Sequence, residues 1–264
     1  MRLVVSADDL GLSPSVTRGV LEAHRGGVVR SASLLVTYPG AEEAAALARA
    51  EHGLEVGLHL DLVGGSPAAD PASVRSLVDA DGRFHRLGEL TRLLALGRVR
   101  AGELAREIRA QAARVRAWGV EARAWDSHRH THLLPPVARV VGAVAREEGV
   151  RWLRRAAPPI LPRAAKPAAL AVATALAAPF LRGVPGNDWY VDLSSWRPPL
   201  DAGAVALLAA RPGVGEIGAH PGYLDDALAA RDPLLARRVD ELAILTDPLL
   251  VAAIGRLVGR RIVA

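Results

Sequence analysis

The sequence predicts an α/β fold built on a parallel sheet, and three observations carry this prediction. Short apolar runs alternate with segments of helical period along the whole chain. Strands that alternate with helices are typical of a parallel sheet, either closed as a barrel or open and doubly wound. The length of 264 residues suits one α/β barrel. Polar residues also recur where the predicted strands end.

The predicted strands are short apolar runs bounded by polar or glycine-containing segments. They occupy residues 3–7, 33–37, 54–60, 122–126, 150–153 and 214–219, with a last candidate at 261–263. A first helix begins at Ser13-Pro14, because serine is a favourable N-cap and proline suits the first helical position. Further helices are expected from residue 41, over 104–115 and from Pro136.

Two stretches are predicted as loops. Residues 64–97 are rich in Gly, Pro and Asp and have weak periodicity. Residues 183–199 are rich in Gly and Pro and carry Trp189, Tyr190 and Trp196. Long loops in compact enzymes are often functional. The sequence does not decide whether the second loop contacts a substrate.

The composition indicates one globular domain over residues 1–264. Half of the residues are hydrophobic, so a large core is available, and the chain has no internal repeat or linker. Cysteine is absent, which excludes disulfides, cysteine-ligated zinc and thiol nucleophiles. The net charge of +5 comes from arginines that are spread along the chain and interleaved with glutamates. Nucleic-acid binders cluster such residues, so no nucleic-acid partner is expected.

No membrane insertion is expected either. The apolar run at 3–7 is too short for a signal peptide, which predicts a cytoplasmic protein. The alanine-rich stretch at 167–181 contains Pro179 and falls short of the roughly 20 residues that a membrane helix needs. This stretch is expected to cover the barrel or to form a homodimer contact.

Acidic residues and histidines follow four predicted strands. Asp8 and Asp9 come directly after the first strand, His59 ends the third, and His220 ends the strand at 214–219. The segment DSHRHTH at 126–132 ends the strand before it. In α/β barrels the carboxyl ends of the strands meet at one mouth, where active sites are assembled. The sequence therefore predicts that these side chains converge.

Each of these residues also has a structural interpretation. The aspartate pair could cap the next helix, His59 could be a core histidine, and His220 could belong to a turn before Pro221. Two observations favour function. Adjacent acids repel each other unless a cation or a proton relieves them. Alternating histidines lie on the same side of any extended segment, as a metal site or proton shuttle requires.

Two imidazoles and one carboxylate suit a divalent cation with open positions. Such a cation polarises a carbonyl and lowers the pKa of water. A second carboxylate could then act as base and a distant histidine as acid. Asp9, His59 and His128 fit as ligands, with Asp8 as base and His220 as acid.

Four motifs together resemble a known family. SADDLG at 6–11, VGLHL at 56–60, DSHRHTH at 126–132 and AHPGY at 219–223 are similar to the successive signatures of YdjC-like carbohydrate deacetylases, including chitooligosaccharide deacetylases and hopanoid-associated relatives. Each motif is short, but four in order at suitable spacing are specific. The resemblance extends from residue 2 to about residue 250.

The resemblance implies a TIM-like (β/α) barrel, which in this family usually has fewer than eight regular strands. It also implies removal of an N-acetyl group from an amino sugar with a divalent metal, with Mg²⁺ expected first and Zn²⁺ as the alternative. Arg154 is expected to orient the base, and Arg155 is the weaker candidate. The full expectation is Asp9, His59 and His128 as metal ligands, Asp8 and His220 as catalytic residues, and Arg154, His130 and His132 as substrate contacts.

Two features depart from the family pattern. Leu10 stands where phenylalanine is frequent, which changes packing and not charge. Aromatic residues make up only 4% of the chain, whereas sugar sites usually stack rings on aromatic side chains. The candidates for stacking are Trp189, Tyr190, Trp196 and Tyr223, which could equally anchor loops. The substrate could therefore be a lipid-linked or unusual amino sugar instead of a chitin fragment.

Two other functions fit parts of the pattern. Two histidines and one carboxylate also make the facial triad of non-haem iron oxygenases, but those usually sit on double-stranded β-helix folds. A non-catalytic sugar- or metal-binding barrel would need neither Asp8 nor His220. The retention of both residues favours the hydrolase.

Overall fold

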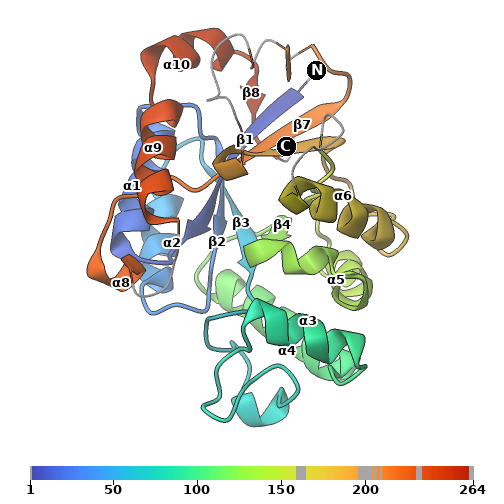
Figure 1. Cartoon of the computed structure of the whole chain (residues 1–264). Coiled ribbons are helices and arrows are strands. Elements are labelled where there is room, and N and C mark those ends of the chain that lie inside the picture. Colours follow the sequence, from blue (N-terminus) through green and yellow to red (C-terminus); the bar gives the residue numbers. More distant parts are fainter. Residues whose placement is uncertain are drawn as a thin grey trace.

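The strands form one curled, all-parallel sheet (Figure 1). The computed structural model describes residues 2–158, 165–195, 204, 207–208, 210–229 and 234–261. The sheet order is β5-β4-β3-β2-β1-β7-β6, and β8 pairs with β1. The strands are β1 (Arg2–Leu10), β2 (Ser31–Leu34), β3 (Glu55–Leu60), β4 (Ala124–Ser127), β5 (Trp152–Leu153), β6 (Trp189–Asp192), β7 (Val214–Ala219) and β8 (Val258–Gly259).

The edge strands β5 and β6 are linked by segments next to them. The backbone N–H of Tyr190 donates to the carbonyl oxygen of Ala157 at 2.6 Å. The side chain of Asn187 accepts from the N–H of Arg155 at 2.8 Å and donates to its carbonyl at 2.6 Å. These bonds join the two edges without regular strand pairing. The predicted α/β barrel is therefore confirmed in an irregular, TIM-like form.

Helices cover the outside of the sheet, with α1, α2 and α9 on one flank and α3 to α6 on the other (Figure 1). Their bounds are α1 (Pro14–Arg25), α2 (Ala41–Arg49), α3 (Leu87–Ala95), α4 (Ala101–Ala117), α5 (Pro135–Glu147), α6 (Ala165–Ala177), α8 (Asp226–Ala229), α9 (Leu235–Leu245) and α10 (Pro248–Ile254). Short 3₁₀ helices are η1 (Pro71–Ser73), η2 (His128–Leu133) and η3 (Leu193–Ser195). As expected, the Ser13 hydroxyl caps α1 by accepting from the N–H of Val16.

The two predicted loops contain regular structure, so these predictions were wrong in part. The first contains η1 and α3. The second contains β6. Its four residues are too short a run to predict a strand when glycine and proline lie on both sides. The last strand is Val258–Gly259, which precedes the predicted strand at 261–263. Residues 262–263 lie outside the described residues. Trp196, the third aromatic residue of the second loop, lies outside them too.

Two glycines of β7 make room for the aromatic residues of β6. A Cβ atom on Gly215 would lie 1.9 Å from the ring of Trp189, and one on Gly218 would lie 2.2 Å from the hydroxyl of Tyr190. Trp189 and Tyr190 are therefore packed into the core. The ring of Tyr190 then lies 5.1 Å from the guanidinium carbon of Arg154.

The alanine-rich stretch forms α6, which contacts η2 and α5. Val172 and Leu176 on α6 remain exposed. The homodimer contact stays a prediction. Among the described helices, none combines the length and the apolar character that crossing a membrane would require.

Candidate metal and catalytic site

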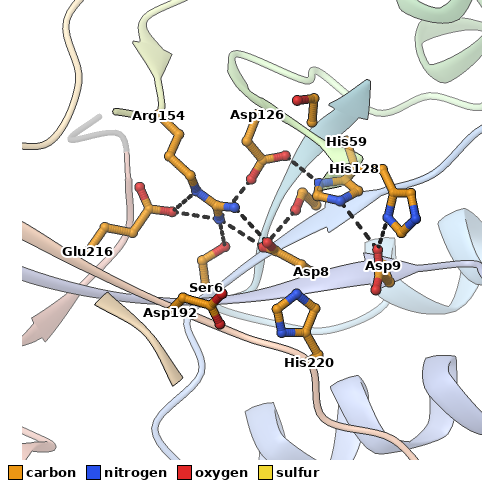
Figure 2. Close-up of polar contacts among 12 residues, drawn as sticks. Ser6, Asp8, Asp9, His59, Asp126, His128, Arg154, Asp192, Glu216 and His220 are labelled. Carbon is orange, nitrogen blue, oxygen red and sulfur yellow. Dashed lines mark hydrogen bonds and ion pairs between the residues drawn. The ribbon is translucent and has the colours of Figure 1, made fainter. Parts of the chain in front are cut away.

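Asp9, His59 and His128 meet at the carboxyl ends of β1, β3 and β4 (Figure 2). The Oδ1 atom of Asp9 lies 2.8 Å from Nδ1 of His128 and 3.3 Å from Nε2 of His59. One donor atom from each residue lies within 4.8 Å of the other two. Asp9 has a φ of 64°, a left-handed conformation that is unusual outside glycine and that aims this carboxylate. We call these three residues the metal triad.

His59 is oriented by a buried carboxylate. Its Nδ1 atom lies 2.6 Å from Oδ1 of Asp126, and both side chains are buried. When Nδ1–H donates to Asp126, the lone pair of Nε2 faces Asp9, as a metal-binding histidine requires. Burial alone would lower the pKa of His59, but the carboxylates of Asp126, Asp9 and Asp8 raise it to about 10. The donor set of two imidazoles and one carboxylate, with one donor atom of each within 4.8 Å of the other two, fits a divalent cation.

A second group with ligand spacing consists of Asp8, His59 and Asp126. Its carboxylates are already engaged by guanidinium groups. Arg154 binds Asp8, and Arg261 donates to Oδ2 of Asp126 at 2.6 Å. The metal triad is therefore the better cation site of the two.

Asp8 is held in place by Arg154 from β5's carboxyl end. Nη1 of Arg154 lies 2.5 Å from Oδ2 of Asp8, and Nη2 lies 2.8 Å from Oδ1. The hydroxyl of Ser33 also donates to Oδ1 at 3.2 Å. Burial would raise the pKa of Asp8, but the charge of Arg154 outweighs it and lowers the pKa. Asp8 is therefore an oriented carboxylate.

His220 follows β7 and points toward the Asp8–Asp9 pair, with Asp192 beside it (Figure 2). Its backbone N–H donates to Oε2 of Glu241 at 2.6 Å, and its Nδ1 lies 3.7 Å from the same oxygen. Burial alone would lower the pKa of His220, but Glu241, with Asp9 and Asp192, raises it to about 9. The carboxylates around His220 therefore favour its protonated form.

Beneath these residues lies a set of charges that we call the buried ion network, made of Asp8, Asp126, Glu216, Arg154 and Arg261. Arg154 Nε donates to Oε1 of Glu216 at 2.9 Å, and its Nη2 lies 2.8 Å from Oδ2 of Asp126. Arg261 Nε donates to the same Glu216 oxygen at 3.1 Å. Carboxylates and guanidinium groups therefore alternate inside the barrel.

Sequence reasoning missed most of the supporting residues. Glu216 had a usable signal, because it is an acid within the apolar strand VGEIGA. Arg238, Arg261 and Glu241 had none, because ordinary helical or loop arginines and glutamates look the same in a sequence. Their partners are distant: Arg238 binds Asp9 across 229 residues, and Arg261 binds Asp126 across 135.

The structure brings together Asp8, Asp9, His59, His128, Arg154 and His220. His132 differs from expectation, because it is fully buried and both ring nitrogens are engaged. Nδ1 lies 2.6 Å from the hydroxyl oxygen of Ser127, and Nε2 lies 3.0 Å from the carbonyl oxygen of Arg154. Burial lowers the pKa of His132 to about 3. This histidine supports the loop and has no ring nitrogen left for substrate.

The extended segment expected for DSHRHTH is also wrong. Arg129 and His130 have φ of 56° and 53°, so the chain turns as η2. The histidines therefore point in different directions. His130 packs edge-on against Tyr190 with ring centroids 5.5 Å apart.

Arg154 is fully buried among carboxylates and holds Asp8. Arg155 points away and donates to the carbonyls of Leu181 and Val184 at 3.0 and 2.8 Å. Tyr223 is held by α1, where its hydroxyl donates to Glu22 at 2.6 Å.

The sequence and the fold both match known proteins. A family model described as YdjC-like protein matches residues 2–256. The carbohydrate deacetylase of Geobacillus stearothermophilus is 38% identical over 250 residues, which cover 94% of this chain and 91% of that protein. The carbohydrate deacetylase of Brevibacillus brevis is 38% identical over 248 residues, 93% of this chain and 91% of that one.

A solved structure agrees with the fold. The crystal structure of an Enterococcus faecalis V583 protein, described as a candidate cellobiose-phosphate cleavage protein, superposes with a TM-score of 0.81 at 27% identity. It covers 98% of this chain and 95% of that chain. Because the family model matches residues 2–256, nearly the whole of this sequence, the chain belongs to the YdjC-like family.

Proposed function

We propose that the protein is a metal-dependent carbohydrate deacetylase that hydrolyses the N-acetyl group of an amino sugar. The observation that carries this proposal is the meeting of the metal triad, the Asp8 carboxylate bound by Arg154 and the His220 imidazole beside Glu241 at one end of the barrel. Relatives at 38% identity that are named carbohydrate deacetylases support the substrate class.

Asp9, His59 and His128 would hold the cation, with Mg²⁺ proposed first and Zn²⁺ as the alternative. When bound, the cation supplies Lewis-acid stabilisation of the charge that develops on the acetamide oxygen. Asp126 contributes by fixing the ring of His59.

Asp8 acts as the base. Its carboxylate takes a proton from water while the water oxygen attacks the acetamide carbonyl carbon. Arg154 binds both carboxylate oxygens and favours the ionised form. Oδ1 also accepts from Ser33, so Oδ2 is the oxygen with a lone pair for a further proton donor. The charge of Arg154 lowers basicity but secures orientation, which a positioned base requires.

His220 acts as the acid. Glu241 lies on its Nδ1 side, so Nε2 is the nitrogen that delivers the proton to the substrate nitrogen as the carbon–nitrogen bond breaks. The products are acetate and the free amino sugar. Base and acid are thus separate groups whose pKa values are shifted in opposite directions.

Acetate release from N-acetylated mono-, di- and lipid-linked saccharides tests the proposal. Stripped protein with Mg²⁺ or Zn²⁺ restored should release acetate and produce one free amine for each acetate. Binding of the same sugars without release would indicate a binding protein, and oxygen consumption would indicate an oxygenase. Either result would contradict the deacetylase.

A further inference from the structure

One turn of helix α9 contains two fully buried charged residues that contact the site. Arg238 and Glu241 lie three residues apart on this helix, and neither side chain is exposed. Nη2 of Arg238 lies 2.5 Å from Oδ2 of Asp9. Oε2 of Glu241 accepts the backbone N–H of His220 at 2.6 Å. The same turn therefore touches both a proposed metal ligand and the proposed acid.

We propose that Arg238 is a positioning residue that occupies Oδ2 of Asp9 and thereby reserves Oδ1 for the cation. This inference rests on the proposed function, because it concerns the metal triad. It predicts that Asp9 binds the cation through one oxygen only. A ligand set of two nitrogens and one oxygen leaves coordination positions for water and substrate.

The two oxygens of Asp9 have different surroundings. Oδ1 faces both imidazoles, at 2.8 Å from Nδ1 of His128 and 3.3 Å from Nε2 of His59. Oδ2 faces Arg238. A charge-assisted bond to one oxygen fixes the rotation of the carboxylate. Without Arg238 the buried carboxylate can rotate and offer both oxygens to the cation.

The backbone of Arg238 is held in place by its neighbours. Its backbone carbonyl accepts the N–H of Gly222 at 3.2 Å, which ties α9 to the segment after His220. A Cβ atom on Gly19 of α1 would lie 2.5 Å from the Cα of Gly222, so only glycine permits this contact. Helix α9, the segment after His220 and helix α1 therefore pack closely against one another. This packing fixes the backbone from which Arg238 contacts Asp9.

The test compares Arg238→Met, Arg238→Lys and wild type by calorimetric metal titration and by the visible spectrum of the Co²⁺ form. Arg238→Met should weaken metal binding by about 10- to 100-fold, as loss of an outer-shell partner does. Its Co²⁺ spectrum should shift, because a second carboxylate oxygen enters the coordination sphere. Arg238→Lys should recover part of the affinity, because its ammonium group can still donate to Oδ2 of Asp9.

Leu242→Ala is the matched control, because Leu242 is a buried residue of α9 within the apolar core. It should lower the melting temperature while leaving metal affinity and spectrum unchanged. Wild-type affinity and spectrum in folded Arg238→Met would overturn the role of Arg238. If that variant does not fold, the same result in folded Arg238→Gln, whose shorter side chain carries no charge, would overturn it. Absence of metal binding by wild type would instead contradict the metal site itself.

Discussion

Arginine–carboxylate pairs occur in two regions with opposite surroundings. On the outer helices, Arg109 pairs with Glu147 at 2.6 Å, with side chains 48% and 55% exposed. Inside the barrel, Arg154 and Arg261 of the buried ion network are fully buried and each contacts several carboxylates. Arginine and carboxylate side chains are therefore exposed to solvent in one region and buried in the protein interior in the other.

The difference in burial between the two regions indicates which charged residues hold the site in place. Exposed pairs are solvated whether or not they meet, so they contribute at most about 1 kcal/mol. Buried pairs pay a large desolvation cost, and removal of one partner leaves an uncompensated charge that costs about 3–5 kcal/mol. The arginine-rich composition thus divides into a solvated surface set and an interior set that holds Asp8, Asp126 and Asp9 in place.

The largest expected effect comes from removing a metal ligand. His128→Ala should abolish tight metal binding and lower the deacetylation rate by on the order of 10³-fold or more, since the Lewis acid is worth several kcal/mol. Calorimetric metal titration with acetate release measures both. Full metal occupancy in this variant would contradict the ligand assignment.

Replacing the base should separate rate from binding. Asp8→Asn keeps the shape but cannot accept the proton, so the rate should fall by about 10²- to 10⁴-fold. Metal affinity should stay within a few-fold of wild type, because the metal triad is intact. A variant with near wild-type turnover would assign the base elsewhere.

A matched pair of substitutions tests the comparison of the two regions directly. Glu216→Gln removes the carboxylate that Arg154 and Arg261 share, and we expect it to lower the free energy of unfolding by about 3 kcal/mol. Glu147→Gln removes the surface partner of Arg109 and should have little effect. Urea unfolding measures both. Equal losses would show that burial does not distinguish the two regions.

The pH dependence should reveal the acid. The pKa of His220 is raised to about 9, and the residue must be protonated to act, so the rate should fall as pH rises through the pKa of this group. A bound cation adds positive charge nearby, which places this alkaline limb at or below about 9. Glu241, Asp9 and Asp192 are the acids that act on it. The His220→Gln variant should have a lower rate and should lack the alkaline limb. An alkaline limb that persists in this variant would show that another residue is the acid.

The barrel and the convergence of its polar residues could be predicted because they depend on local patterns. Apolar runs predicted six of the eight strands in the described part of the chain, and acids or histidines indicated strand ends. Strand β6 could not be found, because glycines at 215 and 218 on its neighbour create its packing. His132 was misjudged because φ values in η2, and not sequence spacing, decide where it points.

Supporting charges were harder still to predict. Arg238 and Arg261 act through contacts between distant segments that only the folded chain brings together. A single sequence gives such residues no mark that separates them from Arg109 on the surface.

The most direct test of the central claim is acetate release as a function of metal occupancy. Stripped protein is titrated with Mg²⁺ or Zn²⁺, and occupancy and acetate release from an N-acetylated sugar are measured on the same samples. The account predicts that release rises in proportion to occupancy of a single site and is lost in His128→Ala. Release that is the same in stripped and loaded protein would contradict it.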